Sequence, residues 1–363
     1  MYHRDKRSVL TLDAGGTNFV FSAIKDNREI IDPVELPAYP DDLHQCLHSI
    51  VTGFKEVMQR IDNTPAAISF AFPGPADYEN GIIGDLPNFP AFRGGIALGP
   101  YLREKFGLPV FINNDGNLFA YGEALAGTLP EINKELEATG NSKRYRNLLA
   151  VTLGTGFGGG VVIDNKLLTG DNGCGGDVWL SANKYDNHLI AEEGVSIRAI
   201  KRAYRELSGD ESNLSPKEIF DIAEGIKAGN REAAIQSFER LGEIAGFTIS
   251  ESLNIVDGIV VIGGGIANAQ KYILPAMVKE MNGIRKTVNG DIFPRLQMKA
   301  YNLEDENEKA IFLKNESESV TIPDSYKTAI YHAVKKIGVS TSMLGTSRAI
   351  AIGAYNFALN QLS

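Results

Sequence analysis

The 363-residue sequence predicts an α/β protein built from two lobes, each containing a sheet with helices between its strands. One observation is the length, which suggests two domains. The second is that apolar runs of strand length alternate with helical patterns. The third is a repeated unit, "VLTLDAGGTNFVFSAI" (9–24) and "LLAVTLGTGFGGGVVI" (148–163). Each copy is an apolar run, a turn of Gly and Thr, and a returning apolar run.

The first lobe is predicted to span 1–122. Strands are expected at 8–12, 18–25, 28–34, 66–72 and 109–112. A helix over 43–61 is indicated by apolar residues at helical spacing after Pro40 and Asp41, and a second helix is expected at 117–127.

The second lobe is predicted to span 123–346. It is expected to begin with strands in "NLLAVTL" and "GGVVI", followed by helices near 195–207, 216–227 and 231–254 and a strand at 257–265. Charged pieces such as "LEDENEKA" and "KNESESV" predict an exposed insertion at about 283–340. The last segment, 347–363, is predicted to be a helix that packs back on the N-terminal lobe.

Composition narrows the possible partners. The net charge of −9 argues against nucleic acid or an anionic membrane as the main partner. With only Cys46 and Cys174, the chain cannot hold a disulfide framework or a zinc site made of cysteines alone. The start lacks the apolar region of a signal peptide, and no apolar run approaches the ~20 residues of a membrane span. The cytoplasm is therefore the predicted compartment.

The first Gly/Thr turn is interpreted as a phosphate site. Glycine lets backbone N–H groups approach an anion, and threonine adds a hydroxyl donor. Asp13, at the end of the preceding strand, is predicted to hold Mg²⁺ directly or through water. The alternative is a carboxylate that only caps its own turn. The predicted ATP-binding residues here are Gly15, Gly16, Thr17 and Asn18.

The second turn is assigned to phosphate for the same reason. Either turn alone is most simply a hairpin. Because each lobe begins with such a turn, the two matching turns indicate that both lobes bind one polyphosphate. No Walker-type loop is present. Further along, the glycines of "VVIGGGIANA" would let adenine and ribose lie against the backbone, although a plain strand-to-helix turn is the simpler alternative. The predicted ATP-binding residues in this part are Gly154, Thr155, Gly156, Gly263, Gly264 and Gly265.

The segment "FINNDGNLFAYGEA" supplies the candidate catalytic residue. Asp115 follows a strand and stands at the start of a helix, where Asp is also a preferred N-cap. A carboxylate at the carboxyl edge of a sheet can instead take the proton from a substrate hydroxyl. In the neighbouring loops, "FAFPGPAD" and "DLPNFP", Gly74 and Asn88 are candidate ligand contacts; plain turn roles are about as favoured for both.

In their order along the chain, these motifs resemble the ROK family of sugar kinases and related repressors. "DAGGTN" and "GTGFGGG" resemble its phosphate motifs, "FPGPAD" and "PNF" its sugar loops, and "NNDGNLFAYGEA" its catalytic segment. "VVIGGGIANA" resembles its adenosine motif and "LGTSRAIAIGAY" its closing helix. The resemblance implies an actin-like, ribonuclease-H-like ATPase fold with nucleotide and sugar in a cleft between lobes. It also implies Asp115 as general base, Asn88 and Asn114 as sugar contacts, and a homodimer.

One segment departs from the family pattern. Where the family has "GExGH" and a cysteine-rich zinc loop, this chain has "GGDVWLSANKYDNHLIAEEGVS". Asp177 occupies the position of the first Glu, Leu180 occupies the position of the His, and the loop cysteines are missing. Glu192 aligns best with the family's last sugar-binding Glu, and Glu193 is the alternative. No zinc is therefore expected, and apolar packing of Trp179, Leu180 and Leu189 is predicted to hold the loop.

The resulting prediction is an ATP- and Mg²⁺-dependent hexose kinase acting on the 6-OH of glucose. Two alternatives remain open. One is a kinase for fructose, mannose, allose or an N-acetylhexosamine, because Asp177 and Leu180 change the sugar side. The other is a sugar- or nucleotide-sensing protein without turnover. Against the sensor stand Asp115 and a first strand at about residue 8, which leaves no room for a DNA-binding segment.

Overall fold

A computed structural model describes residues 5–15, 17–74, 76–84 and 90–363. The chain forms two compact units, each discontinuous in sequence. The first comprises Met1–Gly127, Gly160–Gly176 and Met343–Ser363, and the second Thr128–Gly159 and Asp177–Ser342. Residues 160–176 thus cluster with the first unit although they follow the boundary predicted at 122.

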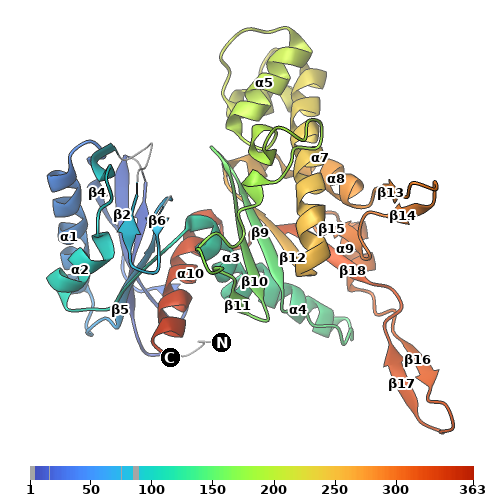
Figure 1. Cartoon of the computed structure of the whole chain (residues 1–363), viewed down its shortest axis with the longest axis horizontal. Coiled ribbons are helices and arrows are strands. Elements are labelled where there is room, and N and C mark those ends of the chain that lie inside the picture. The colour runs from blue at the N-terminus through green and yellow to red at the C-terminus, as the bar shows by residue number, and fades with distance from the viewer. Residues whose placement is uncertain (1–4, 16, 75, 85–89) are drawn as a thin grey trace. The chain divides into compact units, whose positions relative to one another are not determined.

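The first unit is a sheet with helices on both faces (Figure 1). Its strands are β1 (Val9–Ala14), β2 (Asn18–Lys25), β3 (Arg28–Glu29), β4 (Val34–Pro37), β5 (Ala67–Ala71) and β8 (Val110–Asn113), with the small β6 (Ala76–Asp77), β7 (Ile82–Ile83) and β11 (Lys166–Leu167) outside that sheet. Its helices are α1 (Leu43–Arg60), the one-turn η1 (Pro90–Phe92), α2 (Leu98–Phe106), α3 (Asp115–Ala126) and α10 (Thr346–Gln361). The strand order is β3-β2-β1-β5-β8, with β4 also pairing with β2. The single strand expected at 28–34 is two strands, β3 and β4, separated by a loop that contains Pro33, which has no N–H to donate.

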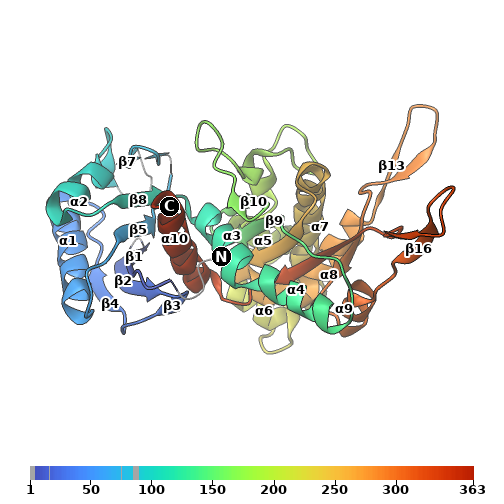
Figure 2. The ribbon, with the colours of Figure 1, turned by 90° about the horizontal axis from the view of Figure 1, so that it is seen from below.

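Alternate residues of the strands fill a core on each face of this sheet. Leu10 and Leu12 pack with Phe54 of α1 in a cluster rich in aromatic rings. Val9, on the opposite face of β1, packs with Tyr355 and Leu359 of α10. Figure 2 shows α1 and α10 on opposite sides of the sheet. The predicted packing of the C-terminal helix on the N-terminal lobe is present in these contacts.

Glycines allow α10 to cross α3 at close range. A Cβ on Gly353 would lie 1.9 Å from the carbonyl oxygen of Leu118, and a Cβ on Gly122 would lie 2.0 Å from that of Ala349. Both distances are far shorter than any real Cβ contact, so the two backbones approach as only glycine permits. The crossing fixes α3, and with it the residues at its start.

The second unit is also α/β. Its helices are α4 (Thr128–Ala138), the short η2 (Val178–Leu180) and η3 (Ala191–Glu193), α5 (Ile197–Ser208), α6 (Pro216–Ala223), α7 (Arg231–Val256), η4 (Gly265–Ala269), α8 (Gln270–Met281) and α9 (Glu306–Leu313). Its strands are β9 (Leu148–Leu153), β10 (Phe157–Ile163), β12 (Ile259–Gly263), β15 (Lys299–Asn302) and β18 (Lys336–Thr341), together with two hairpins, β13 (Ile284–Lys286) with β14 (Ile292–Pro294) and β16 (Glu318–Thr321) with β17 (Thr328–Tyr331). The sheet order is β11-β10-β9-β12-β18-β15, and the chain passes into the first unit along β10.

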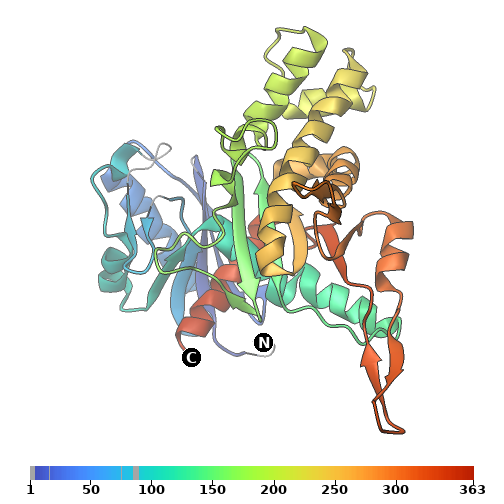
Figure 3. The same ribbon diagram turned by 45° about the vertical axis from the view of Figure 1, so that its right-hand side comes forward.

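The expected exposed insertion at 283–340 needs correction. β15 and β18 are strands of the main sheet, and Ala300, Ile337 and Val339 are buried. The two hairpins are exposed, and α9 buries only Phe312. The β16–β17 hairpin extends away from the body of its unit in Figures 1 and 3. Of the charged pieces that suggested an insertion, "LEDENEKA" runs into α9 and "KNESESV" runs into the exposed strand β16. In the described residues no helix is both long enough and apolar enough to cross a membrane.

Candidate active site

In the first unit, three motifs end side by side at one edge of the sheet. Strands β1, β5 and β8 are parallel, and Asp13 is in register with Ala71, which is in register with Asn113. The segments that follow these residues contain Gly15, Gly74 and Asp115. The carboxyl edge of parallel strands is where ligands bind in open α/β sheets. Sequence motifs about 100 residues apart therefore converge on one edge.

Asp115 is the first residue of α3, and Asn114 is its N-cap. The Asn114 Oδ1 accepts a hydrogen bond from the Gly116 N–H at 2.8 Å. Asn114 rather than Asp115 is therefore the N-cap of α3. Behind it, a Cβ on Gly160 would lie 2.4 Å from the Gly116 carbonyl oxygen, so β10 packs directly against the start of α3.

The electrostatic setting of Asp115 suits a proton acceptor. Its side chain is reached by solvent, but the surrounding protein removes part of its hydration, and this desolvation raises its pKa. A hydrogen bond from the Gly116 N–H acts in the opposite direction, and the negative charge of Asp13 raises the pKa further. The charge of Asp13 thus acts on Asp115, as expected for groups around one reaction centre.

Around the first turn, Asp13 and Thr17 are exposed and Gly15 is half-buried. A Cβ on Gly15 would lie 2.8 Å from the Asn18 carbonyl oxygen, which explains the glycine. The Asn18 side chain donates to Glu35 at 2.5 Å, so its amide is held by the protein. Gly16 lies outside the described residues.

On the predicted sugar side, Gly74 is exposed, and a Cβ there would lie 3.1 Å from the Tyr78 hydroxyl oxygen. That hydroxyl donates to the Phe72 carbonyl at 3.0 Å and so fixes the loop. Asn88 lies outside the described residues.

The second unit repeats the arrangement. Strands β9 and β12 are parallel, with Thr152 in register with Gly263, so the turn at 154–156 and the glycines 264–265 leave the same edge. Within the turn, the Gly154 N–H donates to the Gly156 carbonyl at 3.0 Å, which leaves the N–H groups of Thr155 and Gly156 for a ligand. Gly264 has φ +87°, and a Cβ there would lie 2.2 Å from the Leu153 carbonyl oxygen, so this position requires glycine.

The structure distinguishes Glu192 from Glu193. The Glu192 Oε2 accepts a hydrogen bond from the Phe157 N–H at 3.0 Å, directly behind the second turn. Both carboxylates pair with Arg198, Glu192 at 2.9 Å and Glu193 at 2.8 Å, but Glu193 also pairs with Arg202 at 3.2 Å. The hydrogen bond from Arg198 is the main reason that the pKa of Glu193 is lowered. Of the two glutamates, only Glu192 bonds to the residue that follows the second Gly/Thr turn, and no motif in the sequence pointed to this contact.

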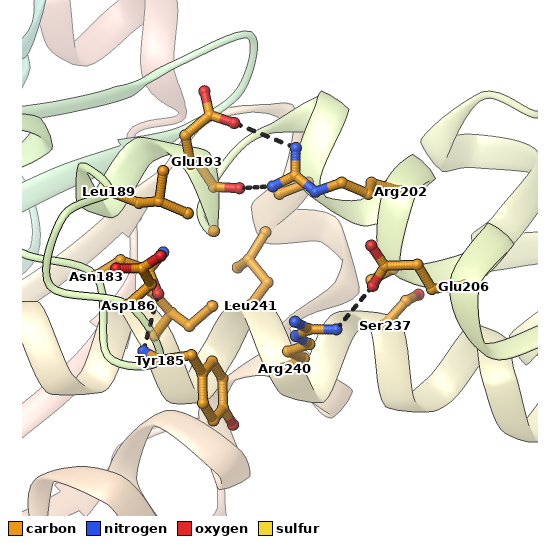
Figure 4. Close-up of a pocket in the computed structure, with 14 residues that line it drawn as sticks. Asn183, Tyr185, Asp186, Leu189, Glu193, Arg202, Glu206, Ser237, Arg240 and Leu241 are labelled. Atoms are coloured by element: carbon orange, nitrogen blue, oxygen red, sulfur yellow. Dashed lines mark hydrogen bonds and ion pairs between the residues drawn. The ribbon is translucent and has the colours of Figure 1, made fainter.

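Glu193 lines a separate pocket of about 320 Å³ between the 183–194 loop, α5 and α7. Figure 4 shows Arg202 reaching Glu193 and Arg240 reaching Glu206 at its rim, with Leu241 between them. The guanidinium groups are thus engaged by carboxylates. Glu193 lines this pocket, whereas Glu192 is not among its lining residues.

The loop that replaces the zinc segment is not held as predicted. Leu180 is 56% exposed and Leu189 is 47% exposed, so apolar packing of these side chains does not hold it. Polar contacts do: the Ala191 N–H donates to the Ser181 carbonyl at 2.7 Å, and Lys184 pairs with Glu280 at 2.9 Å. Asp177 is exposed, and its pKa is raised. Partial loss of hydration is the larger cause, and a hydrogen bond with Trp179 opposes it.

The residues fit Mg²⁺ better than zinc. In the part of the chain that the structure describes, no three His, Cys, Asp or Glu side chains come together as a metal-binding group. Magnesium needs no such cage, because one or two carboxylates with substrate phosphates and water suffice. Asp13, exposed beside the first turn, is a carboxylate of that kind.

Comparison with known proteins gives a consistent result. The model of the ROK family matches residues 9–292. The solved structure of a glucokinase from Parabacteroides distasonis is 57% identical, covers 99% of each chain and superposes with a TM-score of 0.90. The glucokinase of Thermotoga maritima is 28% identical over 75% of this chain and 90% of its own. The N-acetyl-D-glucosamine kinase of Photobacterium profundum is 27% identical over 77% of this chain and 97% of its own. The predicted fold class is confirmed.

Proposed function

The chain belongs to the ROK family, and from this premise we propose that it phosphorylates the 6-OH of glucose with ATP. That it is an ATP-dependent hexose kinase follows from its relatives, which are glucokinases and N-acetylglucosamine kinases. Glucose as the preferred sugar, Mg²⁺ as the ion, and the residue roles below are our proposal. A homodimer in the cytoplasm and the absence of zinc and of nucleic-acid partners belong to it as well.

The observation that carries the proposal is the alignment of Asp13 and Asn113 through Ala71. It brings the first Gly/Thr turn, which we propose binds phosphate, and a carboxylate of raised pKa to one sheet edge. Phosphoryl transfer asks the protein for little more than positioning, charge stabilisation and an acceptor for the hydroxyl proton. These residues supply all three.

In the proposed reaction, Asp115 aligns the sugar hydroxyl and accepts its proton as the hydroxyl oxygen attacks the γ-phosphorus. Asn114, whose Oδ1 already caps α3, offers its amide N–H₂ to the sugar. Gly74, Asn88, Asp177 and Glu192 complete the sugar side. The turns at 15–18 and 154–156 bind the phosphates, and 263–265 bind the nucleoside. Mg²⁺ near Asp13, when bound, would neutralise phosphate charge.

The second candidate is a kinase for another hexose or an N-acetylhexosamine. The observation in its favour is Asp177, which is one methylene shorter than the Glu usual in the family and is exposed. A shorter carboxylate leaves more room on the sugar side. One relative is an N-acetyl-D-glucosamine kinase, so an N-acetylhexosamine is a substrate to compare directly with glucose.

An assay of ADP formation across glucose, mannose, fructose, allose and N-acetylglucosamine tests both candidates. We expect the highest kcat/KM for glucose. A higher value for another sugar would replace glucose by that sugar. No turnover on any of them, in a protein that still binds ATP, would favour the sensing role.

A further inference from the structure

Two buried asparagines lie beside Asp115 in the first unit. Asn113 is the last residue of β8 and Asn117 belongs to the first turn of α3, and both are almost fully buried. The Asn117 Nδ2 donates to the Asn113 Oδ1 at 3.1 Å. The same oxygen accepts a hydrogen bond from the Asn114 N–H at 2.8 Å. One side-chain oxygen therefore ties the residue before Asp115 to the helix that follows it.

The Asn114 N–H determines which way both side-chain amides face. A backbone N–H can only donate, so Asn113 must present its oxygen to it. Asn117 must then present its N–H₂ group, because an oxygen in that place would face the Asn113 oxygen. A leucine or an ionised aspartate at position 117 would have no hydrogen to donate. The pair thus has one permitted arrangement, and it requires a donor at position 117.

Both asparagines are anchored from outside the pair. The Phe72 N–H donates to the Asn113 carbonyl at 3.0 Å, which fixes the backbone of Asn113 in the sheet. A Cβ on Gly160 would lie 2.9 Å from the Asn117 Cα, so β10 packs closely against that part of α3. Among the described residues the Asn117 Oδ1 accepts no hydrogen bond. Burying an amide oxygen without a partner costs stability, so what the asparagine contributes here is its N–H₂ group.

We propose that Asn117 is a positioning residue for phosphoryl transfer. Through Asn113 it fixes the backbone of Asn114, and this holds the Asp115 carboxylate where it can accept the proton of the sugar hydroxyl. The inference rests on the proposed role of Asp115 as general base. A base acts only within hydrogen-bond reach, and a misplacement of about 1 Å can reduce the rate roughly 100-fold. The effect should fall on kcat rather than on the KM for ATP, because the nucleotide is proposed to bind other segments.

The test is Asn117→Ala in the full chain, assayed with the sugar that gives the wild type its highest kcat/KM. We expect kcat to fall about tenfold, the factor that corresponds to about one hydrogen bond, while the KM for ATP stays near the wild-type value. Hydrogen exchange of the segment 110–118, measured by mass spectrometry, should become faster because the acceptor of the Asn114 N–H is no longer held. Asn117→Ser is the substitute, with the same expected results, if Asn117→Ala is insoluble.

Asn356→Ala is the matched control, because Asn356 of α10 forms the same kind of buried pair away from the sheet edge. Its Nδ2 donates to the Asn27 Oδ1 at 2.7 Å, and its own Oδ1 likewise accepts no hydrogen bond among the described residues. We expect Asn356→Ala to lower the Tm as Asn117→Ala does. Its kcat and its exchange over 110–118 should stay near the wild-type values.

Asn113→Asp is the conservative variant, because a carboxylate can still accept from both the Asn114 N–H and the Asn117 Nδ2. It should retain kcat at high pH. Its negative charge beside Asp115 should raise the pKa of that carboxyl, so the acid limb of the kcat/KM profile should move to higher pH. A purely structural role of the pair predicts no such shift.

A wild-type kcat in folded Asn117→Ala would overturn the proposal, as would an equal fall of kcat in Asn356→Ala. An acid limb that does not move in Asn113→Asp would also count against it. If the wild type turned over no sugar, the kinase proposal would fail, and hydrogen exchange would still decide this inference. Unchanged exchange over 110–118 in Asn117→Ala would then overturn it.

Discussion

Glu192 and Phe157 are joined by a 3.0 Å hydrogen bond from the Phe157 N–H to the Glu192 Oε2. The other carboxylate oxygen of Glu192 accepts from Arg198 at 2.9 Å. The same carboxylate proposed for the sugar thus supports the turn proposed for the phosphates. Binding of one substrate should therefore be sensitive to changes at the site of the other.

The first prediction separates the two adjacent glutamates. Glu192→Gln removes a charge from the proposed sugar side, and we expect the KM for sugar to rise about tenfold or more, the scale of a hydrogen bond to a charged group. Glu193→Gln should leave that KM near the wild-type value and cost at most about 1 kcal/mol of stability, because its ion pairs are partly exposed. Steady-state kinetics measure both. A larger KM effect from Glu193→Gln would reverse the assignment.

The second prediction concerns the coupling through the turn. A Cβ on Gly156 would lie 2.6 Å from the Glu192 Oε2, so Gly156→Val should displace this carboxylate as well as obstruct the phosphates. We expect the KM values for ATP and for sugar both to rise. Gly154→Ala is the matched comparison, since nothing lies within 4 Å of its Cβ and Glu192 stays in place. Its sugar KM should remain near wild type; an equal rise in both variants would contradict the coupling.

The third prediction concerns the general base. Asp115→Asn keeps the size of the side chain and loses proton acceptance. We expect kcat to fall about 100-fold or more, while the dissociation constant for sugar, measured by calorimetry, changes little. A kcat within a few-fold of wild type would remove Asp115 from the mechanism.

The fourth prediction follows from the raised pKa of Asp115. Because a base must be deprotonated, the acid limb of the kcat/KM profile should lie above the ordinary pKa of Asp, about 4. The same raised pKa reduces the stability of the fold as pH rises, because the folded state binds this proton more tightly than the unfolded state does. The carboxylate therefore destabilises the fold once pH exceeds the unfolded pKa. Asp115→Asn should have a Tm at pH 7 equal to or above wild type, and a clearly lower Tm would contradict this sign.

The fifth prediction concerns metals. Strong zinc chelation should leave circular dichroism and Tm unchanged, because polar contacts such as Lys184–Glu280 hold the 177–193 loop. Removal of Mg²⁺ should stop turnover, and adding it back should restore it. Stoichiometric zinc found by elemental analysis, and lost together with stability on chelation, would refute the first part.

Much of the fold could be predicted because local signals agreed with tertiary structure. Phe54 lies at helical spacing with its neighbours and is buried in α1, and both Gly/Thr turns connect the strands expected of them. The predictions failed where tertiary context decides. Strand β15 is only four residues long and lies among charged residues. The burial of Ala300 and Tyr301 therefore produced no recognisable hydrophobic periodicity in the sequence.

The sequence alone nominated Asp115 and Asp13, from turn and strand-end chemistry, but it could not predict the contacts around them. The bond between Glu192 and Phe157 joins positions 35 residues apart and leaves no local signature. Likewise, Leu180 and Leu189 were expected to be packed because they are apolar, but the sequence could not tell that ion pairs and backbone bonds hold their loop.

The packing of α10 on the first unit has a consequence for synthesis of the protein. Val9, Ile24 and Ala67 are buried against Tyr355, Ala358 and Leu359, which belong to the last helix of the chain. During translation this face of the first sheet stays uncovered until residues 346–361, which form α10, have left the ribosome. A chain truncated before Thr346 would therefore expose this apolar face of its N-terminal sheet. Chaperones and proteases would then act on the N-terminal part of the chain even though the sequence of that part is intact.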